Sequence, residues 1–138
     1  MIDDILINKS AVIRRCLTRI SKEFQSDPAR LADYTIQDSV ILNLIRACEA
    51  AIDLSMHIVA EHSLGVPQSS RDGFSLLEKA GLLSASTAAA MKRMCGFRNI
   101  AVHSYQEIQM PILVAILENR LPDFEEFLQQ VQAVREAT

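Results

Sequence analysis

The chain has 138 residues, of which 49% are hydrophobic, and it contains only 4 Gly and 4 Pro. This length suits one domain whose core buries roughly two thirds of the unfolded surface. The shortage of turn-forming residues favours long helices over a turn-rich β fold. The formal net charge of −3 argues against a protein that coats nucleic acid generally, because non-specific affinity comes from neutralising phosphates.

The N-terminus and the apolar runs argue against secretion and membrane insertion. Met1-Ile2-Asp3-Asp4 lacks the basic stretch of a signal peptide, and no apolar run approaches the roughly 20 residues of a membrane span. We therefore expect a soluble, cytoplasmic protein with no membrane partner. Cys16, Cys48 and Cys95 lie far apart in apolar contexts, so we expect reduced core thiols and neither a zinc site nor a disulfide.

Positive charge is concentrated in one segment of the chain. Residues 1–68 carry 7 basic and 9 acidic side chains, residues 69–103 carry 5 and 2, and residues 104–138 carry 2 and 6. The positive segment supplies a candidate patch for a polyanion: Arg71, Lys79, Lys92, Arg93 and Arg98. For any one of these residues, a solvated position on a helix face is the plain alternative.

The first half of the chain predicts two amphipathic helices. From Ile2 to about Phe24 apolar residues recur at three- and four-residue steps, and this helix ends before Asp27-Pro28. A second helix of roughly 25 residues is predicted to start at Thr35, whose hydroxyl can cap it while Asp38 completes a capping-box-like pair.

Serine and glycine residues mark the predicted helix ends in the middle of the chain. The connector Leu64–Ser70 ends in a serine that can cap a short helix running from Arg71 to Ala80, where Gly81 stops it. Ser84 then caps a fourth helix, predicted over residues 85–102.

Two prolines shape the C-terminal part of the chain. Pro111 suits the first turn of a fifth helix that continues to Val134. Pro122 should kink this helix or split it in two. Together the elements predict a single all-α domain over residues 1–138, an antiparallel four-helix bundle with a short additional helix.

The residues that carry chemistry follow one another at the end of the predicted fourth helix: Arg98-Asn99-Ile100-Ala101-Val102-His103-Ser104-Tyr105. Arginine offers a permanently charged fork for phosphate oxygens, histidine changes its charge near neutral pH, and tyrosine is a latent oxygen nucleophile. Together they indicate phosphodiester chemistry without a metal.

Helical geometry separates these side chains. On an ideal helix Asn99 and His103 share a face, whereas Arg98 and Tyr105 share another face roughly 100 to 140° away. Either the helix breaks before His103, or a second chain completes the site. A two-fold dimer would supply two histidines as base and acid for attack by an RNA 2′-hydroxyl. Arg98 would then stabilise the charge of the phosphorane, and Asn99 would orient the substrate or the imidazole.

A structural role for the same residues stays open. Arg98 can pair with Glu49 or Asp53 on the second helix. His103 can be a satisfied core histidine, and Tyr105 can pack its ring at the end of the bundle.

Other polar residues give weaker candidates. Glu49 and Asp53 lie one helical turn apart and could bind Mg²⁺, but no further acidic ligand is evident nearby, so we expect them to support Arg46 or Arg98. A second group lacks the His-Glu-x-x-His spacing of a zinc helix and is expected at exposed polar positions: His57, Glu61 and His62.

The motif Arg98-x4-His103-x-Tyr105 resembles the Arg-x4-His-x-Tyr motif of the HEPN toxins called HepT. Three further blocks are similar to the same family in order and spacing: Gln37–Leu44, Gly65–Asp72 and Met94–Asn99. The resemblance covers essentially the whole chain, and the flanking blocks make a short motif specific.

This resemblance implies a HEPN-like fold and a dimeric, metal-independent RNA endonuclease that needs no cofactor and acts as the toxin of a toxin–antitoxin pair. It implies Arg98 and His103 as catalytic residues and Asn99 as the polar residue that follows the arginine. It further implies that a nucleotidyltransferase-fold antitoxin, MntA, adds AMP to the Tyr105 hydroxyl. An adenylate there would block the cleft and repel a phosphate backbone. The basic patch adds candidate RNA contacts: Arg71, Lys92 and Arg93.

Two other functions stay open. A non-catalytic helical module would bind a nucleotide or a partner protein through the same polar cluster, and it would bind adenine nucleotides without turning over RNA. A dimerising bundle would use Arg98, His103 and Tyr105 only to satisfy one another at an interface.

Overall fold

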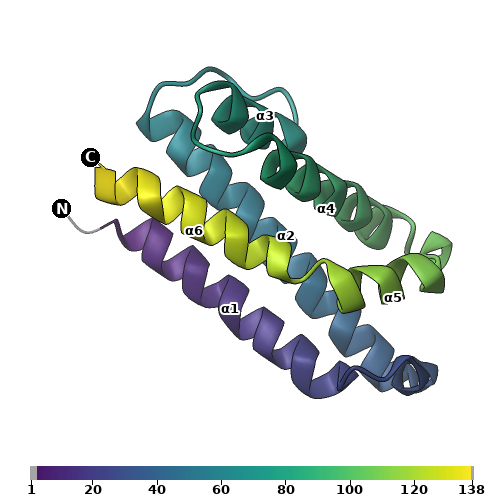
Figure 1. Cartoon of the computed structure of the whole chain (residues 1–138). Coiled ribbons are helices and arrows are strands. Elements are labelled where there is room, and N and C mark those ends of the chain that lie inside the picture. Colours follow the sequence, from purple (N-terminus) through teal and green to yellow (C-terminus); the bar gives the residue numbers. More distant parts are fainter. Residues whose placement is uncertain (1–2, 138) are drawn as a thin grey trace.

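The computed structural model describes residues 3–137. Every regular element in this range is a helix and none is a strand, so the all-α class is confirmed (Figure 1). The long helices are α1 (Asp4–Phe24), α2 (Tyr34–Glu61), α4 (Ala85–His103) and α6 (Pro122–Ala137). The shorter elements are the helices α3 (Ser70–Lys79) and α5 (Met110–Asn119) and the 3-10 helices η1 (Pro28–Ala32) and η2 (Tyr105–Glu107).

The four long helices form the predicted antiparallel bundle. Helix α1 packs on α2, α2 on α4, α4 on α6, and α6 back on α1. In Figure 1 the start of α1 and the end of α6 lie at the same end of the bundle, while η1, η2 and α5 lie towards the other end. Pro122 splits the last predicted helix in two, one of the two outcomes expected of it, so α6 is the fourth member of the bundle and α5 is a second short addition. No helix within the described range has the length and apolar character of a membrane span.

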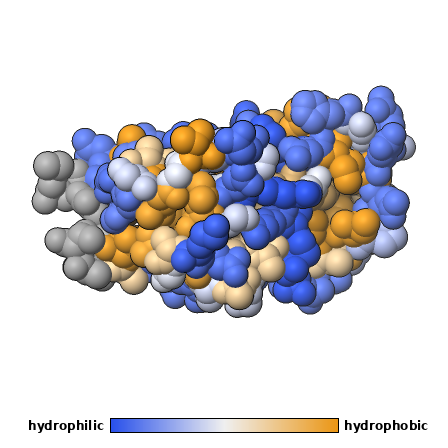
Figure 2. Space-filling view, turned by 90° about the horizontal axis from the view of Figure 1, so that it is seen from above, coloured by the Kyte–Doolittle hydropathy of each residue, from blue (hydrophilic) through white to orange (hydrophobic). Residues whose placement is uncertain are grey.

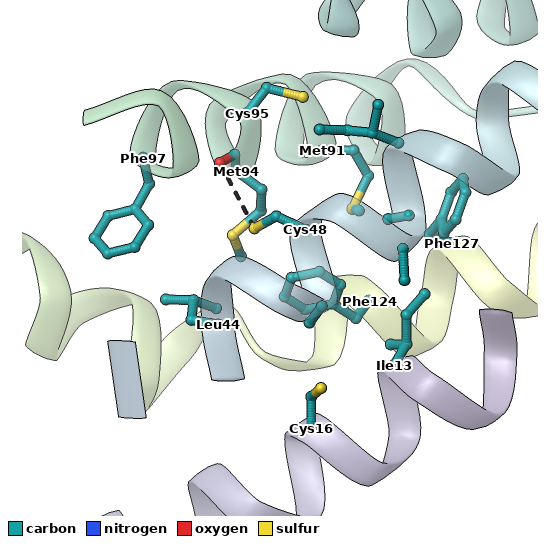
Figure 3. Close-up of a cluster of buried hydrophobic side chains, with 14 of the residues drawn as sticks. Ile13, Cys16, Leu44, Cys48, Met91, Met94, Cys95, Phe97, Phe124 and Phe127 are labelled. Carbon is teal, nitrogen blue, oxygen red and sulfur yellow. Dashed lines mark hydrogen bonds between the residues drawn. The ribbon is translucent and has the colours of Figure 1, made fainter. Parts of the chain in front are cut away.

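One hydrophobic core fills the space between the long helices (Figure 3). Ile13 of α1, Leu44 of α2 and Phe124 of α6 are almost completely buried in it. Phe74 of α3 meets Phe127 of α6 edge to face, with ring centroids 5.5 Å apart. This aromatic pair attaches the short helix to the bundle.

The three cysteines are buried and unpaired, as expected. The Cys48 sulfur lies 3.7 Å from the carbonyl oxygen of Met94 (Figure 3), and the Cys95 sulfur lies 3.9 Å from that of Ser70. Burial raises the pKa of all three thiols, most strongly that of Cys48. The thiols therefore stay protonated and act as small core side chains.

Helix α2 begins differently from the prediction. Its N-cap is Asp33, whose carboxylate accepts hydrogen bonds from the backbone N–H groups of Thr35 at 2.8 Å and Ile36 at 3.4 Å. Such a cap stabilises a helix by about 1 kcal/mol. The predicted capping pair of Thr35 and Asp38 is therefore wrong, and the Asp38 side chain is available for a contact elsewhere.

The other helix ends follow the sequence closely. The Ser84 hydroxyl caps α4 by accepting from the N–H of Thr87 at 3.2 Å, and Gly81 follows α3 with a φ of 79°, which glycine adopts without strain. Helix α3 is shifted by one residue from the predicted bounds. Its N-cap is Ser69 and no side chain caps it, so the predicted cap by Ser70 is wrong. The predicted start of the first helix, Ile2, lies outside the described residues.

Gly73 lets α3 approach α2 closely. A Cβ atom at this position would lie 2.5 Å from the Ser55 hydroxyl oxygen. Ser55 is fully buried and donates its hydrogen bond to the carbonyl oxygen of Ile52 at 2.8 Å. The absence of a side chain at Gly73 is therefore required by the packing of the two helices.

Candidate functional site

Arg98 lies on α4 at the edge of the core, and its side chain is 24% exposed. Its Nη1 donates to Asn99 Oδ1 at 3.0 Å, and its Nη2 lies 3.5 Å from Glu49 Oε2 on α2. Its Nε is buried and has no hydrogen-bond partner among the described residues. An unsatisfied buried donor costs about 1 to 3 kcal/mol, more when charged. The guanidinium thus keeps one donor that no described residue satisfies.

Glu49 and Asp53 of α2 pair with different cations. Glu49 pairs with Arg98, as one of the predicted alternatives had it. Asp53 does not support Arg98 or Arg46, because its carboxylate lies 3.1 Å from Lys9 Nζ on α1. Arg46 makes no ion pair with any residue in the described range, so its predicted support by these carboxylates is wrong.

His103 is the last residue of α4 and is exposed. The helix does not break before it, since the N–H of Ser104 still bonds to the carbonyl oxygen of Ile100 at 2.8 Å. Regular helical geometry then places Arg98 and His103 roughly 140° apart around the axis. The His103 imidazole bonds to no described residue, so the alternative of a satisfied core histidine is wrong.

Asn99 lies between these two side chains. It is partly buried, its amide oxygen accepts from Arg98, and it shares a face of α4 with His103 one turn later. One chain therefore brings Arg98 and Asn99 into contact but leaves His103 on the outer face.

Tyr105 opens η2 directly after α4, and its hydroxyl donates to Asp38 Oδ1 on α2 at 2.5 Å. The residue is 40% exposed. Partial burial of the hydroxyl, together with the Asp38 hydrogen bond and negative charge, raises the pKa of Tyr105 from 10.0 to about 12. The phenol therefore stays protonated at neutral pH and is fixed by the carboxylate, not merely packed by its ring.

Helix α2 links the two ends of the motif. Asp38 and Glu49, the partners of Tyr105 and Arg98, are separated by three helical turns, which places them on one stripe of α2 about 16 Å apart. Leu42, a half-exposed residue, lies between them. Sequence reasoning did not identify Asp38, because its assignment as a capping residue accounted for the carboxylate locally.

The candidate RNA contacts lie on another side of α4. Lys92 Nζ lies 3.8 Å from Glu78 Oε1 on α3, so part of its charge is neutralised. The Arg71 guanidinium lies over Gly96, where a Cβ atom would be 2.7 Å from Nη2. These contacts place Arg71 and Lys92 beside α3, whereas Arg98 meets α2 on another side of α4, so Arg98 does not share their surface as the predicted basic patch had it.

A groove of about 630 Å³ runs between α4 and α5–α6. Arg71, Arg93 and Arg120 contribute cations to its lining, whereas Phe97 and Ile100 make its wall apolar. The surface on the side of α3 and α4 is correspondingly mixed, with apolar patches interrupted by hydrophilic side chains (Figure 2).

Sequence reasoning missed a second basic surface between α1 and α2. Arg15 and Arg19 of α1 and Arg46 of α2 line one depression of about 400 Å³. Arg15 and Arg46 also line the adjoining depression, which reaches Glu49. The signal was the one-turn spacing of Arg15 and Arg19 opposite Arg46, but the packing of the helices was needed to place them together.

Exposed positions were predicted for His57, Glu61 and His62. This is confirmed for Glu61 and wrong for His57 and for His62, which follows α2, since both histidines are partly buried. His57 Nε2 lies 3.2 Å from Asp3 Oδ2 and 3.2 Å from Glu61 Oε2. Asp3 is also the N-cap of α1, so this cluster ties the start of α1 to the end of α2. Its ligand atoms are close enough to hold a metal ion, but it lies at the end of the bundle remote from Tyr105.

A family model described as Ribonuclease HepT-like matches residues 13–131 of this chain. The chain belongs to the ribonuclease HepT-like family. The predicted family resemblance is therefore confirmed, and with it the assignment of the protein as an enzyme, a ribonuclease.

Relatives of this HepT-like chain match it along nearly its full length. It is 47% identical over 131 residues to the mRNA nuclease HepT of Shewanella oneidensis, covering 95% of this chain and 98% of the relative. It matches the solved structure of a tri-AMPylated Shewanella oneidensis HEPN toxin in complex with MNT antitoxin, with 47% identity, a TM-score of 0.91, and 96% and 99% of the two chains covered. A toxin–antitoxin structure with AMP-PNP gives 46% identity, a TM-score of 0.91, and coverage of 95% and 99%.

Proposed function

We propose that this HepT-like ribonuclease is the toxin of a toxin–antitoxin pair and cleaves messenger RNA without a metal ion in a cleft that two copies of the chain build together. The observation that carries the proposal is the unbroken α4, which keeps Arg98 and His103 of one chain roughly 140° apart. The 47% identity to an mRNA nuclease supports the choice of substrate.

A second copy of the chain completes the site in this proposal. Ile100 and Val102 are each 45% exposed and lie on either side of His103, about 60° and 100° away around α4, so a homodimer that covers this face would bury apolar surface on both sides of the histidine. A two-fold axis beside α4 would bring two His103 and two Arg98 side chains into one cleft.

The chemistry then follows from the residues present. One His103 accepts the proton of the RNA 2′-hydroxyl as its oxygen attacks the neighbouring phosphorus, and the other protonates the departing 5′-oxygen. Arg98, held by Asn99 and Glu49, stabilises the charge that builds on the phosphorane. The products are a 2′,3′-cyclic phosphate end and a 5′-hydroxyl end. Candidate contacts for the RNA backbone are Arg71, Lys92 and Arg93.

Control of this toxin is proposed to act at Tyr105. A nucleotidyltransferase antitoxin of the MntA type would transfer AMP from ATP to the Tyr105 hydroxyl, as the AMPylated toxin in its antitoxin complex and the AMP-PNP structure suggest. Tyr105 and Arg98 meet the same stripe of α2, so the adenylate adds bulk and negative charge near the cleft. Because this chemistry requires RNA and ATP, we infer that the pair acts in the cytoplasm.

The test is cleavage of RNA by purified protein in EDTA, after mass spectrometry has shown Tyr105 to be unmodified. Wild type should cut and leave 2′,3′-cyclic phosphate ends, whereas Arg98→Ala and His103→Ala should each lose at least about 100-fold in rate, the scale of an acid–base or charge-stabilising group. Arg14→Ala and His62→Ala are matched controls outside the site and should cut normally. Wild-type rates in both site variants would refute the assignment.

Mixing Arg98→Ala with His103→Ala tests the shared cleft. Mixed dimers retain one arginine and one histidine in the cleft, so part of the rate should return, because one of the two proton transfers then takes place beside an intact Arg98. A mixture that forms dimers and stays as inactive as its components would contradict a site built from two chains.

A further inference from the structure

The two tyrosines of the chain lie in different chemical surroundings. Tyr34 is 77% exposed, and its hydroxyl bonds to no described residue. Tyr105 is only 40% exposed, yet its hydroxyl donates to the Asp38 carboxylate at 2.5 Å. Access alone would favour Tyr34 as an acceptor for a transferred group, so the feature that distinguishes Tyr105 is the carboxylate.

Both tyrosines are found at the same end of the bundle. Tyr34 is the first residue of α2, and Asp38 follows one helical turn later on the same face. Their shared end of the bundle does not by itself explain why an enzyme docking there would modify one phenol and not the other. Tyr34 is consequently a built-in control for the chemical effect of Asp38.

A phenol becomes a good nucleophile only when its proton leaves. The pKa of Tyr105 is raised to about 12, so phenolate is scarce at neutral pH and the proton must be removed as the new bond forms. Asp38 already holds that proton in a hydrogen bond, and it is exposed, so it can pass the proton on to water.

We propose that Asp38 is the general base for the modification of Tyr105 and thereby selects this tyrosine over Tyr34. This inference rests on the proposed function, because it requires Tyr105 to be the acceptor of AMP. In the step, the Tyr105 oxygen forms a bond to the α-phosphorus of a bound adenosine triphosphate. The bond from that phosphorus to the bridging oxygen breaks, pyrophosphate leaves with the electron pair, and the phenolic proton moves to the Asp38 carboxylate.

The experiment compares rates of AMP transfer with ATP and a nucleotidyltransferase antitoxin of the MntA type. Mass spectrometry of the peptides that contain Tyr105 and Tyr34 measures each initial rate. The variants are Asp38→Asn, which keeps a hydrogen-bond acceptor but is not a base, Asp38→Glu, which restores a carboxylate, and Tyr34→Phe as the control.

We expect Asp38→Asn to slow modification of Tyr105 by about 100-fold or more, the usual contribution of a general base. Asp38→Glu should recover part of the rate, and Tyr34→Phe should be modified like wild type. RNA cleavage by unmodified Asp38→Asn should stay unchanged and its circular dichroism spectrum should match that of wild type, which excludes a general loss of structure.

Two results would overturn the inference. Modification of Asp38→Asn at the wild-type rate would show that Asp38 neither removes the proton nor selects the tyrosine. Modification of wild type at Tyr34 in place of Tyr105 would refute both the role of Asp38 and the proposed acceptor, whereas the RNA cleavage test with Arg98 and His103 variants would remain unaffected.

Discussion

Arg98 combines a charged head with incomplete neutralisation. Its only ionic partner in the described range is Glu49, at 3.5 Å, and one of its N–H groups is buried without an acceptor. Exposed ion pairs of this kind contribute at most about 1 kcal/mol to folding. The arrangement therefore contributes little to folding stability. In the proposed reaction the guanidinium would meet a phosphate oxygen with little rearrangement of the protein.

The hydroxyl of Tyr105 offers a direct spectroscopic test of its contact with Asp38. Ultraviolet difference titration should show one tyrosine with a pKa near 12 in wild type, and Asp38→Asn should move that step down towards the ordinary value of 10.0. Tyr105→Phe should remove the step altogether. Identical titration curves for wild type and Asp38→Asn would show that the carboxylate does not hold the phenol.

The same shift predicts a pH dependence of stability. Since the folded state binds the Tyr105 proton more tightly than the unfolded state, the contact stabilises the protein fully below pH 10.0 and loses this effect as the pH rises to about 12. The difference in unfolding free energy between wild type and Tyr105→Phe should therefore shrink over that range. A constant difference would contradict the raised pKa.

At the level of helices, the sequence allows the elements to be predicted well and their contacts poorly. The periodicity of residues 4–24, the hydroxyl of Ser84 and the break at Pro122 are local signals, and each places a helix or its end correctly. The start of α2 was misplaced because Asp33 and Thr35 are both good N-caps, and only the path of the chain from η1 decides between them.

In the candidate site too, local geometry was easier to predict than contacts between distant residues. Regular geometry gave the angular separation of Arg98, Asn99 and His103, but the sequence left open whether the helix breaks before His103, and α4 includes it. The bonds from Arg98 to Glu49 and from Tyr105 to Asp38 join residues 49 and 67 positions apart, and they depend on how α4 and η2 pack against α2. The sequence offered Glu49 as one of two possible partners of Arg98, whereas nothing in it indicated the pairing of Tyr105 with Asp38.

Gly73 supplies a prediction about the contact between α2 and α3. Gly73→Ala would place a methyl group 2.5 Å from the Ser55 hydroxyl, so we expect a loss of about 1 to 3 kcal/mol in the free energy of unfolding, the usual cost of overpacking. Urea denaturation measures it. Adding Ser55→Ala removes the clashing oxygen and should recover part of the loss. Additive effects of the two substitutions would show that the clash is not the cause.

Over the whole molecule, charged and apolar side chains around α4 stay exposed in a single chain. Arg98 turns towards α2, His103 lies on the outer face, and the exposed Ile100 and Val102 flank it. The cationic groove with Arg71 and Arg93 continues along the other side of the helix. A homodimer centred on α4 would bury the apolar side chains and align the cations along one path for RNA.

Ile100 provides the test of that assembly. Ile100→Glu places a charge in the proposed apolar contact, and we expect it to shift the protein towards monomers in analytical ultracentrifugation and to reduce RNA cleavage in proportion, without lowering the thermal stability of the monomer. Ile7→Glu makes the same change at a 58% exposed site on α1 and should leave assembly and cleavage unaltered. A dimer that persists in Ile100→Glu would rule out this face as the interface.

The straight path of α4 through His103 also has a consequence for how the toxin responds to its own abundance. If each cleft requires two copies, freshly made chains acquire activity as the square of their concentration while that concentration lies below the dissociation constant of the dimer. A low concentration of chains would then give very little active dimer, whereas a rapid rise in unmodified chains would raise toxicity more than in proportion. The helix that separates arginine from histidine would thus set a threshold for growth arrest.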